Sequence, residues 1–177
     1  GAVAPKGFAP DWCAWSQDSR SFVADPQKGV TGSYDAIRVY LWAGMLSERD
    51  PARKMLLLSL RGPRQALAEN HAVPEYVDTV TGQVRGMAPL GFSGAMLPYL
   101  KALDAADALA DQVARVPGGR AAPPAPNATT PPVAPLPYYE QCLLLFGQAW
   151  LDGRYEFGRN GQLQTSWRTL CRPNRPA

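Results

Sequence analysis

The chain has 177 residues, with 18 Lys and Arg against 15 Asp and Glu and a formal net charge of +3. This length allows one domain with a buried core, and the 46% share of apolar residues is ordinary for a globular protein. The small charge and the absence of a Lys/Arg run argue against a nucleic-acid partner. No apolar run approaches the length that a bilayer span needs, so we expect no membrane span.

The three cysteines, Cys13, Cys142 and Cys171, are an odd number without a C-x-x-C pair, and His71 is the one histidine. This composition argues against a zinc site and against a thiol nucleophile, and no other metal or organic cofactor is indicated. We expect Cys142 to be a small buried apolar residue, and a disulfide between Cys142 and Cys171 stays open.

Residues 1–31 carry few periodic signals, and we expect loops with short helical pieces there. Trp12 and Trp15 lie in this region. Their rings could stack on the face of a sugar, but we favour the interpretation that they fill the ends of a helical core.

Residues 36–46 contain a single charge, Arg38, and predict a helix that is buried nearly all round. Ser33 is a plausible N-cap for this helix, which puts Asp35 in its first turn. Tyr34, Asp35 and Arg38 can then share one side of that turn. Such an aspartate either caps the helix and pairs with the arginine or serves as a general base.

A second helix is expected over residues 50–60, with Pro at its first position and its apolar face at residues 55–58 and 60. Gly62-Pro63 interrupts it. Two hairpins are predicted by their turn dipeptides, Thr81-Gly82 and Asn160-Gly161.

The apolar spacing from Ser93, a possible N-cap, to Val116 predicts one long helix, with Pro98 tolerated near its first turn. Residues 117–137 are rich in proline and predict an exposed loop insert. Residues 138–150 are apolar on most sides and predict a buried helix.

The run SYDAIRVYLWAGM, residues 33–45, resembles the signature of glycoside hydrolase family 8. Three further segments and a closing turn resemble the same family: 4–12, 77–100, 138–150 and 158–161. The resemblance implies that residues 1–177 are the C-terminal part of a single catalytic domain. The implied fold is all-α, roughly the second half of an (α/α)6 barrel with short β-hairpins in its loops.

The resemblance also implies an endo-β-1,4-glucanase that hydrolyses cellulose with inversion and works beside a bacterial cellulose synthase complex. Asp35 then corresponds to the catalytic base, and Tyr34 and Arg38 would orient the water and contact the sugar. The family's general acid is a Glu in the half that this sequence lacks, and no glutamate here matches its motif. The alternative is a carbohydrate-binding or scaffold fragment that lacks the acid and does no catalysis.

The family is exported, so we expect a periplasmic or secreted protein. The first ten residues nevertheless show none of the features of a secretory signal peptide, namely a basic start, a long apolar middle and a cleavage site. We therefore expect that the natural chain begins upstream of this sequence.

Overall fold

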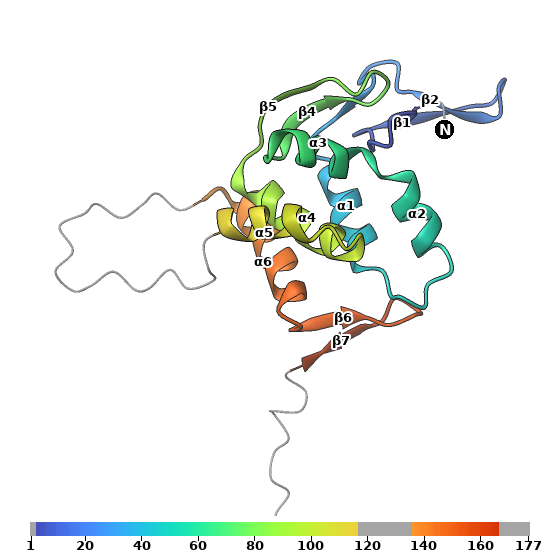
Figure 1. The fold of residues 1–177 in the computed structure, drawn as a ribbon. Coiled ribbons are helices and arrows are strands. Elements are labelled where there is room, and N and C mark those ends of the chain that lie inside the picture. Colours follow the sequence, from blue (N-terminus) through green and yellow to red (C-terminus); the bar gives the residue numbers. More distant parts are fainter. Residues whose placement is uncertain (1–2, 117–135, 167–177) are drawn as a thin grey trace, which may run out of the picture.

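A computed structural model describes residues 3–116 and 136–166 of the chain. Helices gather in the middle of the molecule and small sheets lie at its edges (Figure 1). The helices of these residues are α1 (Ile37–Met45), α2 (Arg53–Ser59), α3 (Gly62–Asn70), α4 (Leu90–Ala102), α5 (Ala106–Arg115) and α6 (Tyr138–Leu151). The helical expectation is therefore confirmed for the described part of the chain.

The strands form three small antiparallel sheets, which together contain more strand than the sequence predicted. They are β1 (Cys13–Ser16) with β2 (Ser21–Ala24), β3 (Thr31–Gly32) with β4 (Pro74–Asp78) and β5 (Val84–Met87), and β6 (Tyr155–Phe157) with β7 (Leu163–Thr165). Both hairpins predicted from turn dipeptides are confirmed. The expectation of short helical pieces before residue 31 is wrong, because β1 and β2 form a hairpin there, with Cys13 opposite Ala24.

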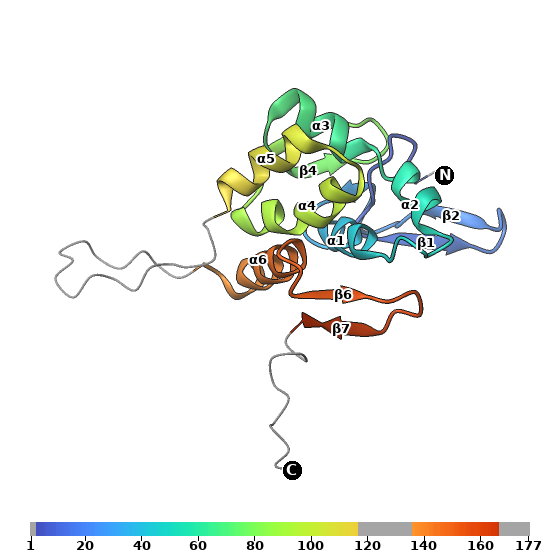
Figure 2. The ribbon, with the colours of Figure 1, turned by 60° about the horizontal axis from the view of Figure 1, so that its bottom comes forward.

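Helix α4 lies at the centre of the molecule, with α1 and α6 packed against it (Figure 2). Every residue from Gly91 to Leu100 is buried, so α4 is enclosed on all sides. Helix α1 is buried on one face only, since Val39 and Trp42 are 38% and 45% exposed. The prediction that residues 36–46 are buried nearly all round is wrong on that outer face.

Glycines allow the backbones of these helices to come close together. A Cβ atom on Gly44 of α1 would lie 2.2 Å from the backbone nitrogen of Tyr99 in α4. A Cβ atom on Gly147 of α6 would lie 1.8 Å from the carbonyl oxygen of Gly94. Because backbone atoms cannot move aside as a flexible side chain can, these positions fix how α1 and α6 lie on α4.

The long helix predicted from Ser93 to Val116 is two helices. The chain turns between α4 and α5, where Asp104 has a φ of 51°. Ser93 is no N-cap but lies inside α4, where its hydroxyl donates to Gln112 Oε1 at 2.9 Å. Pro98 lies deep inside α4 and not near its first turn.

The bounds of one helix and the burial of two also differ from expectation. Helix α2 begins at Arg53 and not at residue 50, whereas the expected interruption at Gly62-Pro63 is confirmed, since α2 ends at Ser59 and α3 starts at Gly62. Met55 and Leu58 of α2 are 70% and 61% exposed. Helix α6 has the predicted bounds within one residue, but it is buried mainly along one line of contact with α4, while Leu145 is 66% exposed.

Within residues 3–116 and 136–166, no helix is long and apolar enough to cross a membrane. Cys142 is half-buried, so the expectation of a fully buried side chain is wrong. The proposed partner in a disulfide, Cys171, and nearly all of the insert at 117–137 lie outside the described residues.

Replacing Gly147 with alanine tests the close approach of α6 to α4. Alanine favours a helix over glycine by about 1 kcal/mol. Here we expect the opposite sign, a loss of about 1–3 kcal/mol in the free energy of unfolding, because the new methyl group meets the Gly94 carbonyl. Urea unfolding measures the change. Leu145→Ala on the exposed face of α6 is the control, with a change within about 0.5 kcal/mol; equal effects of the two variants would contradict the close packing.

Candidate active site

The residues that the sequence singled out, Tyr34, Asp35 and Arg38, lie in and just after the turn that joins β3 to α1. The side chain that caps α1 comes from another segment. Asp11 Oδ1 accepts hydrogen bonds from three backbone N–H groups of this turn, those of Ser33 at 2.8 Å, Asp35 at 3.0 Å and Ala36 at 2.8 Å.

Ser33 is therefore not the side-chain cap that the sequence suggested. Its hydroxyl donates instead to the carbonyl of Glu75 at 2.6 Å, which ties the turn to β4. Among the described residues the carboxylate of Asp35 accepts no backbone N–H bond, and the N–H groups of Asp35 and Ala36, in the turn just before α1, are satisfied by Asp11. Of the two predicted structural roles of Asp35, capping is wrong and pairing with Arg38 is confirmed.

Each oxygen of the Asp35 carboxylate has one donor. Arg38 Nη2 donates to Oδ1, and Trp12 Nε1 donates to Oδ2 at 3.0 Å. The side chains of Asp35 and Arg38 are 42% and 48% exposed. An exposed ion pair adds at most about 1 kcal/mol to stability, so its main effect is to orient the carboxylate.

Both the hydroxyl and the ring of Tyr34 make specific contacts. Its hydroxyl donates to Glu75 Oε1 at 2.9 Å, and this hydrogen bond, with partial burial, raises the pKa of Tyr34 to about 12. Its ring packs edge-on against Phe92 with centroids 5.0 Å apart. Phe92 itself is 1% exposed and belongs to the core.

An open pocket of about 390 Å³ lies beside the carboxylate of Asp35. Its lining residues are Tyr34, Asp35, Arg38, Pro89, Pro137, Tyr139 and Glu140. Tyr139 donates to the backbone carbonyl of Tyr34 at 2.5 Å, and burial raises the pKa of Tyr139. The pocket thus combines aromatic faces, two carboxylates and a guanidinium, which are the groups that contact the C–H faces and hydroxyls of sugars.

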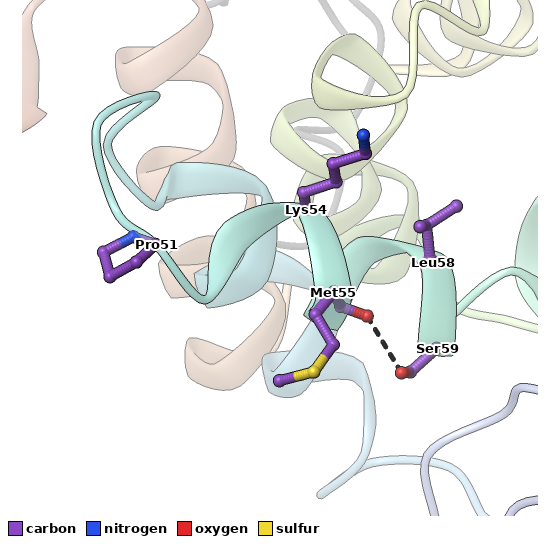
Figure 3. Close-up of a pocket in the computed structure, with 5 residues that line it drawn as sticks. All are labelled: Pro51, Lys54, Met55, Leu58 and Ser59. Atoms are coloured by element: carbon purple, nitrogen blue, oxygen red, sulfur yellow. Dashed lines mark hydrogen bonds between the residues drawn. The ribbon is translucent and has the colours of Figure 1, made fainter.

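A second hollow of about 430 Å³ lies on α2 (Figure 3). It is lined by Pro51, Lys54, Met55, Leu58 and Ser59, and the Ser59 hydroxyl donates to the carbonyl of Met55 at 2.9 Å. This hollow contains no carboxylate, so it lacks the acid and base that glycoside hydrolysis requires. Within residues 3–116 and 136–166, no group of three or more His, Cys, Asp or Glu side chains could hold a metal ion.

Sequence reasoning missed several parts of this site. Trp12, which we expected to fill a core, is 53% exposed and bonds to Asp35. Asp11 and Trp12 stand in the segment 4–12, which resembles the family, and sugar stacking was the functional role that the sequence left open for Trp12. Tyr139 and Glu140 stand in the segment 138–150, which also resembles the family, but its apolar pattern indicated only the start of a buried helix.

Removing the carboxylate of Asp11 tests how far its hydrogen bonds to the turn before α1 stabilise the fold. We expect Asp11→Ala to lower the free energy of unfolding by about 1–3 kcal/mol, because backbone N–H groups lose their acceptor. Asp11→Asn keeps one acceptor oxygen and is expected to lose less. Asp25→Ala is the control, since Asp25 caps only the exposed N–H groups of Gln27 and Lys28. Urea unfolding ranks the three variants, and an Asp11→Ala loss no larger than the control's would contradict this role.

Known endoglucanases are similar in sequence to this chain. An endoglucanase from Xanthomonas axonopodis pv. citri (strain 306) is 50% identical over 166 residues, which cover 94% of this chain and 40% of that protein. An endoglucanase from Escherichia coli (strain K12) is 37% identical over 170 residues, covering 96% of this chain and 42% of the relative.

The crystal structure of endo-1,4-D-glucanase from Vibrio fischeri ES114 matches with a TM-score of 0.71 and 28% identity, over 94% of this chain and 45% of that one. The chain therefore spans less than half the length of these relatives. The model of glycosyl hydrolases family 8 matches residues 1–153, most of the sequence. This chain belongs to glycosyl hydrolases family 8.

Proposed function

We propose that this chain is the C-terminal part of the catalytic domain of an endo-β-1,4-glucanase, with Asp35 as its general base. The observation that carries the proposal is the Asp35 carboxylate at an open pocket, with Arg38 and Trp12 each donating to one oxygen. A base must be reachable by the water it activates and must hold one orientation. The 42% exposure of the Asp35 side chain meets the first condition, and the two donors meet the second.

The proposed reaction is hydrolysis of a β-1,4-glucan with inversion at the anomeric carbon. Asp35 takes a proton from a water molecule, whose oxygen attacks the anomeric carbon from the face opposite the leaving group. A second carboxyl group, in the acid form, donates its proton to the glycosidic oxygen as that bond breaks. Inverting enzymes keep the two carboxyl groups about 6.5–9.5 Å apart, which leaves room for the water.

In this proposal Tyr34 and Arg38 contact the sugar at the point of cleavage. Arg38 would make this contact while it donates to Asp35. Tyr34 would contact the sugar with its ring, while its hydroxyl donates a hydrogen bond to Glu75. No metal or organic cofactor has a part in this chemistry.

The general acid belongs, in this proposal, to a part of the enzyme outside this sequence, and the complete domain is an (α/α)6 barrel. Two observations support a partial domain. The chain spans 40% to 45% of the length of its relatives. Met55 and Leu58 on α2 are also 70% and 61% exposed, and in this proposal further helices of the same barrel cover them.

We further propose a periplasmic or secreted location and an association with a bacterial cellulose synthase complex. Both rest on the family resemblance. Cell fractionation and co-purification with the synthase test them, and an enzyme found in the cytoplasm would contradict the first.

The decisive experiment replaces Asp35 with asparagine in the full-length enzyme. We expect kcat on carboxymethylcellulose to fall by about 10²–10⁴-fold, which is the usual contribution of a general base. The circular dichroism spectrum and the melting temperature should stay unchanged, because the side chain is half-exposed and caps nothing. Asp18→Asn, in the exposed turn between β1 and β2, is the control and should keep full activity.

Retained turnover in Asp35→Asn would remove Asp35 from the role of base. A full-length wild-type protein that binds cellulose without releasing reducing sugar would favour the alternative of a binding or scaffold protein. The anomer released first, followed by NMR on a cello-oligosaccharide, tests inversion, and a retained configuration would overturn that part of the proposal.

The 177-residue chain alone should bind glucan weakly and release no reducing sugar, because it lacks the proposed acid. A reducing-sugar assay with the isolated chain and with the full-length enzyme at equal molar concentration measures the difference. Turnover by the isolated chain would show that both carboxyl groups lie within this sequence.

A further inference from the structure

We propose that Trp12 is a positioning residue for Asp35, and that Asp11 and Trp12 act as a unit that fixes the backbone and the side chain of the base. This proposal rests on the role of Asp35 proposed above. Asp11 and Trp12 are adjacent in sequence, and both form hydrogen bonds with Asp35. Asp11 Oδ1 accepts from the N–H of Asp35 at 3.0 Å, and Trp12 Nε1 donates to Asp35 Oδ2 at 3.0 Å.

The backbone before Trp12 is fixed to the same turn that carries Asp35. The N–H of Asp11 donates to the carbonyl of Thr31 at 2.8 Å, and the N–H of Ala9 donates to the buried hydroxyl of Tyr40 at 2.7 Å. Thr31 belongs to β3 and Tyr40 to α1, so the segment is tied on both sides of the turn. The distance between the backbones of residues 12 and 35 is therefore set by the fold.

Core packing does not account for Trp12. Its side chain is 53% exposed, and within residues 3–116 and 136–166 it makes no ring–ring contact. Trp15 is 51% exposed too, but its ring packs edge-on against Phe22 across the hairpin, with centroids 5.1 Å apart. The indole N–H of Trp12 thus has its bond to Asp35 as its specific contact.

Trp12 bonds to the carboxylate without lining the pocket. It is absent from the residues that line the pocket, whereas Asp35 and Arg38 are among them. Indole N–H is a donor only, so it takes no proton from the water that a base activates. Its effect is to occupy one lone pair of Oδ2 and to hold the χ angles of Asp35, which leaves the pocket side of the carboxylate to the water.

Replacing Trp12 with phenylalanine in the full-length enzyme tests the proposal, because phenylalanine keeps an aromatic face and removes the donor. We expect kcat to fall about 10- to 100-fold, since a misaligned base loses much of its effect, while KM changes less than about twofold. Replacement of Trp12 by benzothienylalanine, which keeps the bicyclic ring and has sulfur in place of N–H, should give the same loss. Trp15→Phe is the matched control and should keep kcat.

A rise in KM with unchanged kcat would mean that Trp12 binds sugar and would overturn the positioning role. A loss with phenylalanine that benzothienylalanine restores would overturn it too, because ring size and not the N–H would then matter.

A readout without turnover separates this proposal from the role of Asp35. The indole N–H resonance of Trp12, assigned by its loss in Trp12→Phe, should move in Asp35→Ala and stay in place in Asp18→Asn. An unmoved resonance overturns the contact whatever the activity. A moved resonance together with full activity of Asp35→Asn overturns the proposed base and leaves the contact between Trp12 and Asp35 established.

Discussion

The hydrogen bonds that the Asp11 carboxylate accepts from three backbone N–H groups set the geometry of the candidate site. A helix N-terminus carries unpaired donors and the positive end of the helix dipole, so it binds an anion. In this chain Asp11, from a distant segment, supplies that anion. Asp35 directly precedes Ala36, the N-cap residue of α1. Both oxygens of its carboxylate are therefore available for Arg38, Trp12 and a ligand. An aspartate that had to cap its own helix would point its carboxylate at the backbone instead of at the pocket.

Features with local physical causes could be predicted from the sequence. The hairpin at Asn160-Gly161 follows from turn geometry that needs only neighbouring residues, and α6 follows from its apolar spacing. The break between α4 and α5 could not be predicted in this way. The apolar spacing continues through Asp104, and what bends the chain there is the packing of α5 back against α4. The deep position of Pro98 was missed for the same reason, because the true start of α4, at Leu90, precedes the serine that seemed to cap it.

The residues of the candidate site also fall into those that local sequence indicates and those that only the fold brings together. The spacing of Tyr34, Asp35 and Arg38 places them within one turn of each other, and the family resemblance singled out Asp35 as the candidate base. Their partners could not be recognised, since each comes from a segment that only the fold brings near. The hydrogen bond from Tyr139 to the carbonyl of Tyr34 spans 105 residues, and the bond from Trp12 to Asp35 spans 23. No periodicity links such positions, so the sequence indicated Asp35 and its neighbour Arg38 but not the partners that come from distant segments.

The exposed apolar side chains fall into two chemical kinds, and this difference bears on where a sugar can bind. On α2, Met55 and Leu58 line a hollow that contains no carboxylate and no aromatic ring, and Lys54 and Ser59 are its polar lining side chains. Such a surface favours burial against other apolar side chains. Beside Asp35, aromatic rings alternate with carboxylates and a guanidinium. A pyranose has apolar C–H faces and a polar rim, and only a surface of the second kind matches both. The volumes of the two hollows are similar, so it is their lining chemistry that favours the one at Asp35 as the site of the proposed glucan.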